Sequence, residues 1–189
     1  MNDYKIKCID ERGPYITTYT GKKFHACAPW QREICLKDIA HSLSQNCRFN
    51  GHCDDFYSVA EHCIHVSNFV PKQYALWGLL HDASEAYVPD IPAPFKSDLT
   101  NFREQEDRIL QKILEKYGLE MPEPEEVHKV DKLIAGLEGR DLFKKPPEWV
   151  ELYDLSMFGD FKITKPMSPR EAELAYIYRF KELTEEEEI

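Results

Sequence analysis

Histidine and carboxylate residues stand in three apolar segments of the chain. His62 lies in "SVAEHCIHVSNFV", the adjacent pair His81 and Asp82 lies in "GLLHDASEAY", and Asp131 follows a valine in "EEVHKVDKLIAG". Taken singly, such a histidine is most often a core residue bonded to a carbonyl oxygen, and such a carboxylate is most often paired with arginine. Two imidazoles and two carboxylates together supply the mixed nitrogen and oxygen ligands that a divalent ion accepts. Their joint occurrence therefore favours a metal site.

Each of the three segments is predicted to be helical, which would bring these residues together. Ser58 and Glu61 have the spacing of a capping box, so a helix is expected to begin there. Further helices are predicted over residues 74–87 and 125–143. Helical periodicity gives the helix after Ser58 an inward stripe of Val59, His62, Val66 and Phe69. The helix over residues 125–143 has a similar stripe of Val127, Val130, Ile134 and Leu137.

The helix predicted over residues 74–87 carries a polar stripe beside its apolar one. The stripe consists of Gly78, His81, Asp82 and Glu85. Except for the adjacent His–Asp pair, its members are three or four residues from one another and so share one face of a helix. Gly78 is expected to leave room above the imidazole of His81. An ordinary amphipathic helix would place this stripe in water, but polar groups at the boundary of a buried face are costly unless they are partnered.

The remaining segments complete an all-α fold of about six helices with a small β-hairpin at the start. The hairpin is predicted from residues 4–9 and 15–19 around the turn "DERGP". Other helices are expected in "LKDIAHSLSQ", in "TNFREQEDRILQKILEKYG" and after Ser168, and "VPDIPAPFK" is expected to be irregular. We predict one domain over residues 1–189, with the hairpin in 1–30, the metal site in 31–145 and a C-terminal loop and helix in 146–189.

The composition of the 189-residue chain excludes several functional classes. Its net charge of −10 disfavours broad binding to nucleic-acid backbone. The N-terminus lacks the apolar core of a signal peptide, and no uninterrupted apolar run reaches the length of a membrane span. We therefore expect no membrane partner and a cytoplasmic location, in a bacterium or a phage-infected host. The six cysteines form no C-x-x-C pair and are expected to be free thiols in or near the core; a cysteine zinc site is less favoured.

The order His62, His81–Asp82, Asp131 resembles the HD-domain metal-dependent phosphohydrolases. The segments "IAHSLSQNCRFNGH", "FYSVAEHCIHVS" and "GLLHDASEAYVPDIPAPFK" look like the branch that contains the 5'-deoxynucleotidases and the phage dATP triphosphohydrolases. The likeness runs from about Thr18 to Asp141. It implies that the four residues bind one or two divalent ions, which could be Mn, Co, Zn, Fe or Mg. It also implies that Glu85 activates the attacking water and that Asp90 is a further catalytic acid.

The same resemblance implies a substrate side. Arg48 and Phe49 match an arginine–aromatic pair that lies over the substrate, although the nucleotidases carry tryptophan at the second position. Pro94 and Lys96 match a Pro-x-Lys motif of the triphosphohydrolases. The expected substrate is a deoxynucleotide, with a triphosphate preferred over the monophosphate of a 5'-deoxynucleotidase. A di-iron oxygenase and a nucleotide-binding sensor are less favoured functions for the same fold. A homodimer or larger homo-oligomer is expected.

Several further polar residues are given structural roles. Glu138, Arg140 and Asp141 are expected to form a salt-bridge set on a helix surface, and a site role for Glu138 is less favoured. Trp77 is expected in the core. His128 and Lys132 are candidates for a second phosphate-binding cation.

Overall fold

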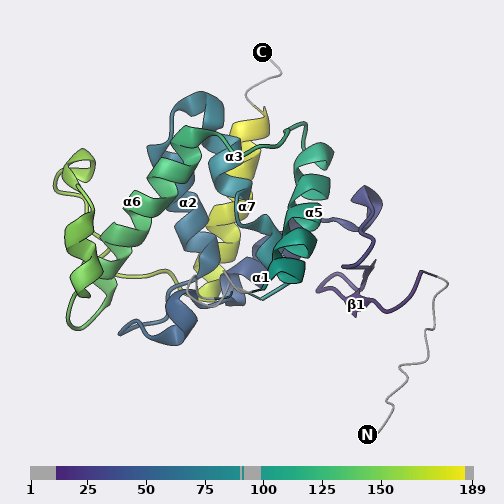
Figure 1. Cartoon of the computed structure of the whole chain (residues 1–189), viewed down its shortest axis with the longest axis horizontal. Helices are drawn as coiled ribbons and strands as arrows, with labels where there is room; N and C mark the ends of the chain where they lie inside the picture. Colours follow the sequence, from purple (N-terminus) through teal and green to yellow (C-terminus); the bar gives the residue numbers. More distant parts are fainter. Residues whose placement is uncertain (1–11, 90, 92–98, 186–189) are drawn as a thin grey trace, which may run out of the picture.

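The computed structural model describes residues 12–89, 91 and 99–185 of the chain, and within them the fold is mostly helical (Figure 1). Its α-helices are α1 (Leu36–Gln45), α2 (Val59–Phe69), α3 (Ala75–Leu80), α5 (Thr100–Lys116), α6 (Glu125–Leu142) and α7 (Pro169–Glu185). Short 3-10 turns connect them, and a two-stranded antiparallel sheet precedes them. The expectation of an all-α fold with a small β element is confirmed. None of the described helices is long and apolar enough to cross a membrane.

The described hairpin lies further along the chain than the predicted one. Strand β1 (Ile16–Thr17) lies within the segment predicted as a strand, but it pairs with β2 (Lys23–Phe24), which follows it. The turn between them contains Gly21 at a φ of +81°, a conformation that glycine adopts without steric cost. This turn is not the predicted one, "DERGP", whose first two residues lie outside the described part of the chain, so a pairing across "DERGP" stays a prediction. The other predicted strand, 4–9, lies outside the described residues.

Helix α2 is the centre of the bundle, in contact with α1, α3, α6 and α7. Figure 1 shows α6 and α5 on opposite sides of it. The Ser58 hydroxyl accepts a hydrogen bond from the Glu61 amide, as the capping-box spacing predicts. The Glu61 carboxylate, however, accepts from the Met167 amide and so links the start of α2 to the segment before α7. The predicted stripes of α2 and α6 lie inward, with Phe69 half-buried and the others buried.

The helix predicted over residues 74–87 is broken at the His–Asp pair. Helix α3 ends at Leu80, and a 3-10 turn, η4 (Ala83–Ala86), follows Asp82. Two side chains of the α1 region hold this turn from outside, because Asn46 donates to the Glu85 carbonyl and Ser42 donates to the Ala86 carbonyl. The prediction of one continuous helix over residues 74–87 was therefore wrong: after Asp82 the backbone forms a 3-10 turn, in which the Glu85 amide donates to the Asp82 carbonyl.

Gly78 serves the packing of α3 on α2. A Cβ added there would lie 3.2 Å from Val70 Cγ2 and 3.3 Å from the backbone of Ser67. The space that the missing side chain leaves is thus occupied by α2, and the expectation that it lies above the imidazole of His81 was wrong. The close approach brings the helix that carries His62 next to the one that ends at His81.

The structure confirms the expectation for Trp77 and only part of the expectation for the cysteines. Trp77 is buried, and its indole N–H donates to the Glu120 carbonyl, as expected for a core residue. The five described cysteines are free, but Cys27 and Cys47 are exposed, so the expectation that all lie in or near the core was wrong for these two. Cys63 is fully buried.

Candidate metal centre

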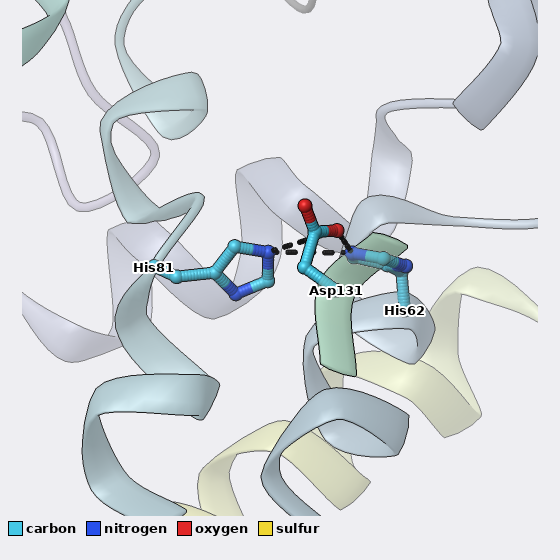
Figure 2. Close-up of side chains that lie close together, drawn as sticks. All are labelled: His62, His81 and Asp131. Carbon is cyan, nitrogen blue, oxygen red and sulfur yellow. Dashed lines mark hydrogen bonds and ion pairs between the residues drawn. The ribbon is translucent and has the colours of Figure 1, made fainter. Parts of the chain in front are cut away.

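Three ligand-type side chains converge from three different elements (Figure 2). His62 comes from α2, His81 directly follows α3, and Asp131 comes from α6. His62 Nε2 lies 3.3 Å from His81 Nε2 and 3.0 Å from Asp131 Oδ1, and His81 Nε2 lies 3.7 Å from the same oxygen. Two ligand atoms that share a tetrahedral ion at about 2.1 Å are about 3.4 Å apart. The spacing therefore matches that of atoms around one metal ion.

Asp82 joins this cluster from the same junction as His81. Its Oδ2 lies 3.2 Å from His81 Nε2 and 3.8 Å from His62 Nε2. The structure thus brings together all four residues that the sequence singled out, although they are up to 69 positions apart in the chain (131 − 62).

Both imidazoles are oriented so that their Nε2 atoms point into the cluster. His81 Nδ1 lies 2.8 Å from the Gly78 carbonyl oxygen, which can only accept, so Nδ1 carries the proton. His62 Nδ1 lies 2.6 Å from the Glu138 carboxylate, which likewise accepts. The Nε2 lone pairs are therefore left for a cation, and this is the arrangement that metal-binding histidines adopt.

Glu138 is the residue whose sequence-based role was wrong. It is fully buried, and its carboxylate accepts from His62 Nδ1 and from the Tyr57 hydroxyl at 2.9 Å. Its second oxygen accepts from Arg48 Nε at 3.2 Å. The surface salt-bridge set with Arg140 and Asp141 was wrong for Glu138, and only the other two residues pair. The seven-residue spacing from Asp131, which is two helical turns, was the available signal.

The charges of the centre favour a bound cation. Burial disfavours the imidazolium of His81, but the adjacent Asp82 and Asp131 outweigh it and raise the pKa of His81 well above its usual value. Burial likewise disfavours the carboxylate of Asp131, but hydrogen bonds with both histidines hold the pKa of Asp131 well below its usual value. Without a cation the cluster therefore retains protons, and a divalent ion would supply the same positive charge.

Arg48 places a second positive group beside the cluster. Its Nη1 lies 3.5 Å from Asp82 Oδ2 while its Nε is held by Glu138. Burial disfavours the guanidinium, but Glu138 and Asp82 keep the pKa of Arg48 above its usual value. The Arg48 guanidinium is thus fixed next to the residues that would bind the metal ion, where it could pair with an anionic substrate.

Phe49, the other predicted substrate residue, is built into an aromatic cluster. It has a left-handed backbone, with a φ of +51°, and it packs against Phe143 and Trp149. Trp149 belongs to the 3-10 turn η5 (Glu148–Leu152), which lies on α6. The turn approaches α6 so closely that a Cβ at Gly139 would overlap the indole of Trp149. The C-terminal connection therefore supports the loop that carries Arg48.

The structure does not establish a site role for the other predicted site residues. Glu85 is buried in η4, one turn after the His–Asp pair, and its role with the attacking water stays a prediction. Asp90, Pro94 and Lys96 lie outside the described residues. His128 is exposed and pairs with Glu123 at 3.3 Å.

Glu123 is a neighbour of the centre that the sequence did not reveal. It lies in the loop before α6, where burial raises the pKa of Glu123 although His81 and His128 nearby oppose the rise. No motif or periodicity marks this position, because it lies in the predicted linker "MPEPEE".

Comparison with known proteins gives the chain a family. It is 38% identical over 172 residues to the uncharacterized protein YfdR of Escherichia coli (strain K12), an alignment that covers 90% of this chain and 96% of YfdR. The chain belongs to the YfdR family. It is also 29% identical over 137 residues to the uncharacterized protein RCAP_rcc00048 of Rhodobacter capsulatus, covering 65% of this chain and 70% of that protein. No protein-family model matches the chain.

Proposed function

We infer that this member of the YfdR family is a metal-dependent phosphohydrolase that acts on deoxynucleotides, with release of the deoxynucleoside and triphosphate from a dNTP. The observation that carries the proposal is the orientation of His62 and His81. Each donates its Nδ1 proton to a fixed acceptor, so both Nε2 atoms meet the Asp131 carboxylate within bonding range of one ion. The resemblance to the HD-domain phosphohydrolases, which have the same residues in the same order, supports the choice of reaction.

The residues present fit a divalent cation as the resident group. His62, His81, Asp82 and Asp131 would hold it through nitrogen and oxygen atoms. A bound divalent ion polarises a phosphoryl oxygen and lowers the pKa of a bound water toward neutrality.

The remaining groups have separable tasks. Arg48, fixed by Glu138, supplies positive charge for the non-bridging phosphoryl oxygens. Glu85 is the acid that we assign to accept the proton of the attacking water, because it follows the His–Asp pair by one turn. The local cations also explain how a chain of net charge −10 could bind a polyanion.

The test is turnover of a panel of dNTPs and dNMPs with Mn²⁺, Co²⁺, Mg²⁺ or Zn²⁺. We expect metal-dependent release of triphosphate from a dNTP, and loss of that release in Asp131→Asn and Glu85→Gln. Glu126→Gln, which changes an exposed carboxylate on the same helix as Asp131, serves as the control and should retain activity. Release of inorganic phosphate from dNMPs alone would instead identify a 5'-deoxynucleotidase. No cleavage of any nucleotide by the metal-loaded protein would reject both.

A further inference from the structure

A thiol lies beside the candidate metal centre. Cys63 follows His62 on α2 and is fully buried. Its Sγ, a ring nitrogen of His81 and a carboxylate oxygen of Asp82 all lie within 4.8 Å of one another. This Cys63 group shares His81 with the group of His62, His81 and Asp131. The thiol therefore lies next to two of the four candidate ligands.

The position of Cys63 is unusual among the described cysteines. Of the five, it alone is fully buried, and it alone belongs to a group whose geometry could hold an ion. Atoms bound to one tetrahedral ion at about 2.1 Å for nitrogen and about 2.3 Å for sulfur are about 3.6 Å apart. Because the separations in the Cys63 group are at most 4.8 Å, Sγ lies within about 1.2 Å of the spacing at which it could share an ion with His81 and Asp82.

We propose that Cys63 is a ligand of the metal centre, so that the resident ion has sulfur as well as nitrogen and oxygen around it. When the ion binds, the S–H bond breaks, the sulfur–metal bond forms and the proton leaves to solvent. The proposal rests on the metal centre of the proposed function and deepens it by naming a ligand and a class of ion.

The added sulfur has a consequence for the choice of ion. Thiolate is a soft ligand, whereas Mg²⁺ and Mn²⁺ favour oxygen. With Cys63 in the set, the centre takes a borderline ion such as Zn²⁺, Co²⁺ or Fe²⁺ in preference to Mg²⁺. With nitrogen and oxygen ligands alone, this preference would be weaker.

Cobalt substitution tests the proposal on the full chain. The metal-free protein is titrated with Co²⁺ under reducing conditions, and its absorption spectrum and bound cobalt are measured together. We expect an intense near-ultraviolet band from sulfur-to-cobalt charge transfer. Cys63→Ser should lose this band while still binding Co²⁺, and its Zn²⁺ affinity should fall roughly tenfold or more. Cys35→Ser, a half-buried cysteine outside both groups, should keep the band.

The outcomes separate this proposal from the proposed function. Bound cobalt without the band in the wild type, or a band that persists in Cys63→Ser, overturns the ligand assignment and leaves the hydrolase proposal standing. A band without hydrolysis of any nucleotide supports Cys63 and rejects the hydrolase. Failure to bind cobalt at all overturns the ligand assignment, and it rejects the hydrolase as well if none of the other ions supports turnover. Because the wild-type spectrum alone can overturn the proposal, it stays falsifiable even if Cys63→Ser does not fold.

Discussion

Glu138 connects the two halves of the candidate site at the scale of single residues. One buried carboxylate accepts from the histidine that would bind the ion and from the arginine that would bind the substrate. Burial raises the pKa of Glu138, but Arg48 and His62 outweigh it and lower that pKa below its usual value, so the group is a carboxylate near neutral pH. Its charge is therefore available to hold both side chains.

Replacing Glu138 should lower the metal affinity, although Glu138 is not itself a candidate ligand. In Glu138→Gln the acceptor for His62 Nδ1 becomes neutral and Arg48 loses its buried counter-charge. We expect metal affinity to fall about 10- to 100-fold, as is typical when the group behind a metal-binding histidine is changed. Isothermal titration calorimetry would measure this, with Glu126→Gln as the control. Unchanged affinity would show that Glu138 does not orient His62.

The metal-free protein should lose stability in acid. The pKa values of Asp131 and Glu138 are lowered by folding, so these carboxylates stabilise the fold above their ordinary pKa of about 4. That contribution is lost as the pH falls through their folded pKa values. The pKa values of His62 and His81 are raised, so their contribution is complete below about pH 6.5 and is lost as the pH rises through the folded values.

Urea unfolding of the metal-free protein as a function of pH would measure the loss of the carboxylate contribution in acid. We expect the free energy of unfolding to fall steeply below about pH 4, and less steeply in Asp131→Asn. If both proteins lost stability equally over the acid range, the assignment to Asp131 would be wrong.

At the scale of elements, two close contacts determine where the site residues stand. Gly78 lets α3 approach the backbone of α2, and Gly139 lets η5 approach α6. The first contact sets His81 against His62, and the second supports Phe49 and so the loop of Arg48. The first contact thus places two candidate ligands together, and the second supports the loop of Arg48 from α6, the helix that also carries Asp131.

Gly78→Ala should separate α2 from α3. Its new Cβ would meet Ser67 backbone that has no flexible end to move aside, which costs about 1–3 kcal/mol. Alanine regains about 1 kcal/mol of helix propensity, so we expect a net loss of about 1 kcal/mol in the free energy of unfolding. Metal affinity should fall as well, because the two histidines are carried by these elements. Chemical denaturation and metal titration would test this, with the exposed Gln73→Ala as control. Wild-type values for both would contradict the role given to this contact.

Trp149→Ala should affect substrate binding far more than metal binding. Loss of the indole removes the support of Phe49, so we expect KM for the nucleotide to rise about tenfold while metal affinity stays within about twofold. Steady-state kinetics and metal titration would separate the two. Leu152→Ala, at a highly exposed position of the same 3-10 turn, should change neither. A parallel loss of metal affinity would show that the two sides are not independent.

At the scale of the whole molecule, a bound ion would join elements that are distant in sequence. The candidate ligands come from α2, the α3–η4 junction and α6, all in the bundle around α2. An ion bound by the folded state alone stabilises it by mass action.

Metal should therefore raise the melting temperature. At a free concentration of about 100 times Kd the gain is about 2.7 kcal/mol, and each kcal/mol corresponds to about 2–4 °C for a chain of this size. Differential scanning fluorimetry with Zn²⁺, with and without a chelator, would measure the shift. Asp131→Asn should abolish most of it. An equal shift in that variant would place the stabilising ion elsewhere.

The sequence by itself determined the helices, their inward stripes and the four residues of the cluster, because periodicity and capping are local properties. It could identify His62, His81, Asp82 and Asp131 as a set, since each breaks an apolar pattern. Only the tertiary structure decided the change to a 3-10 turn after the His–Asp pair, because the carbonyls of Glu85 and Ala86 at its end accept hydrogen bonds from the side chains of Asn46 and Ser42, which are distant in sequence.

Tertiary contacts also decided the roles of Glu138 and Cys63. A carboxylate and a thiol in helices have many ordinary explanations, and their sequence positions do not reveal what lies opposite. Glu138 became a positioning residue because it meets His62, 76 residues away, in a buried contact. Cys63 became a candidate ligand because α3 ends where His81 and Asp82 can reach it.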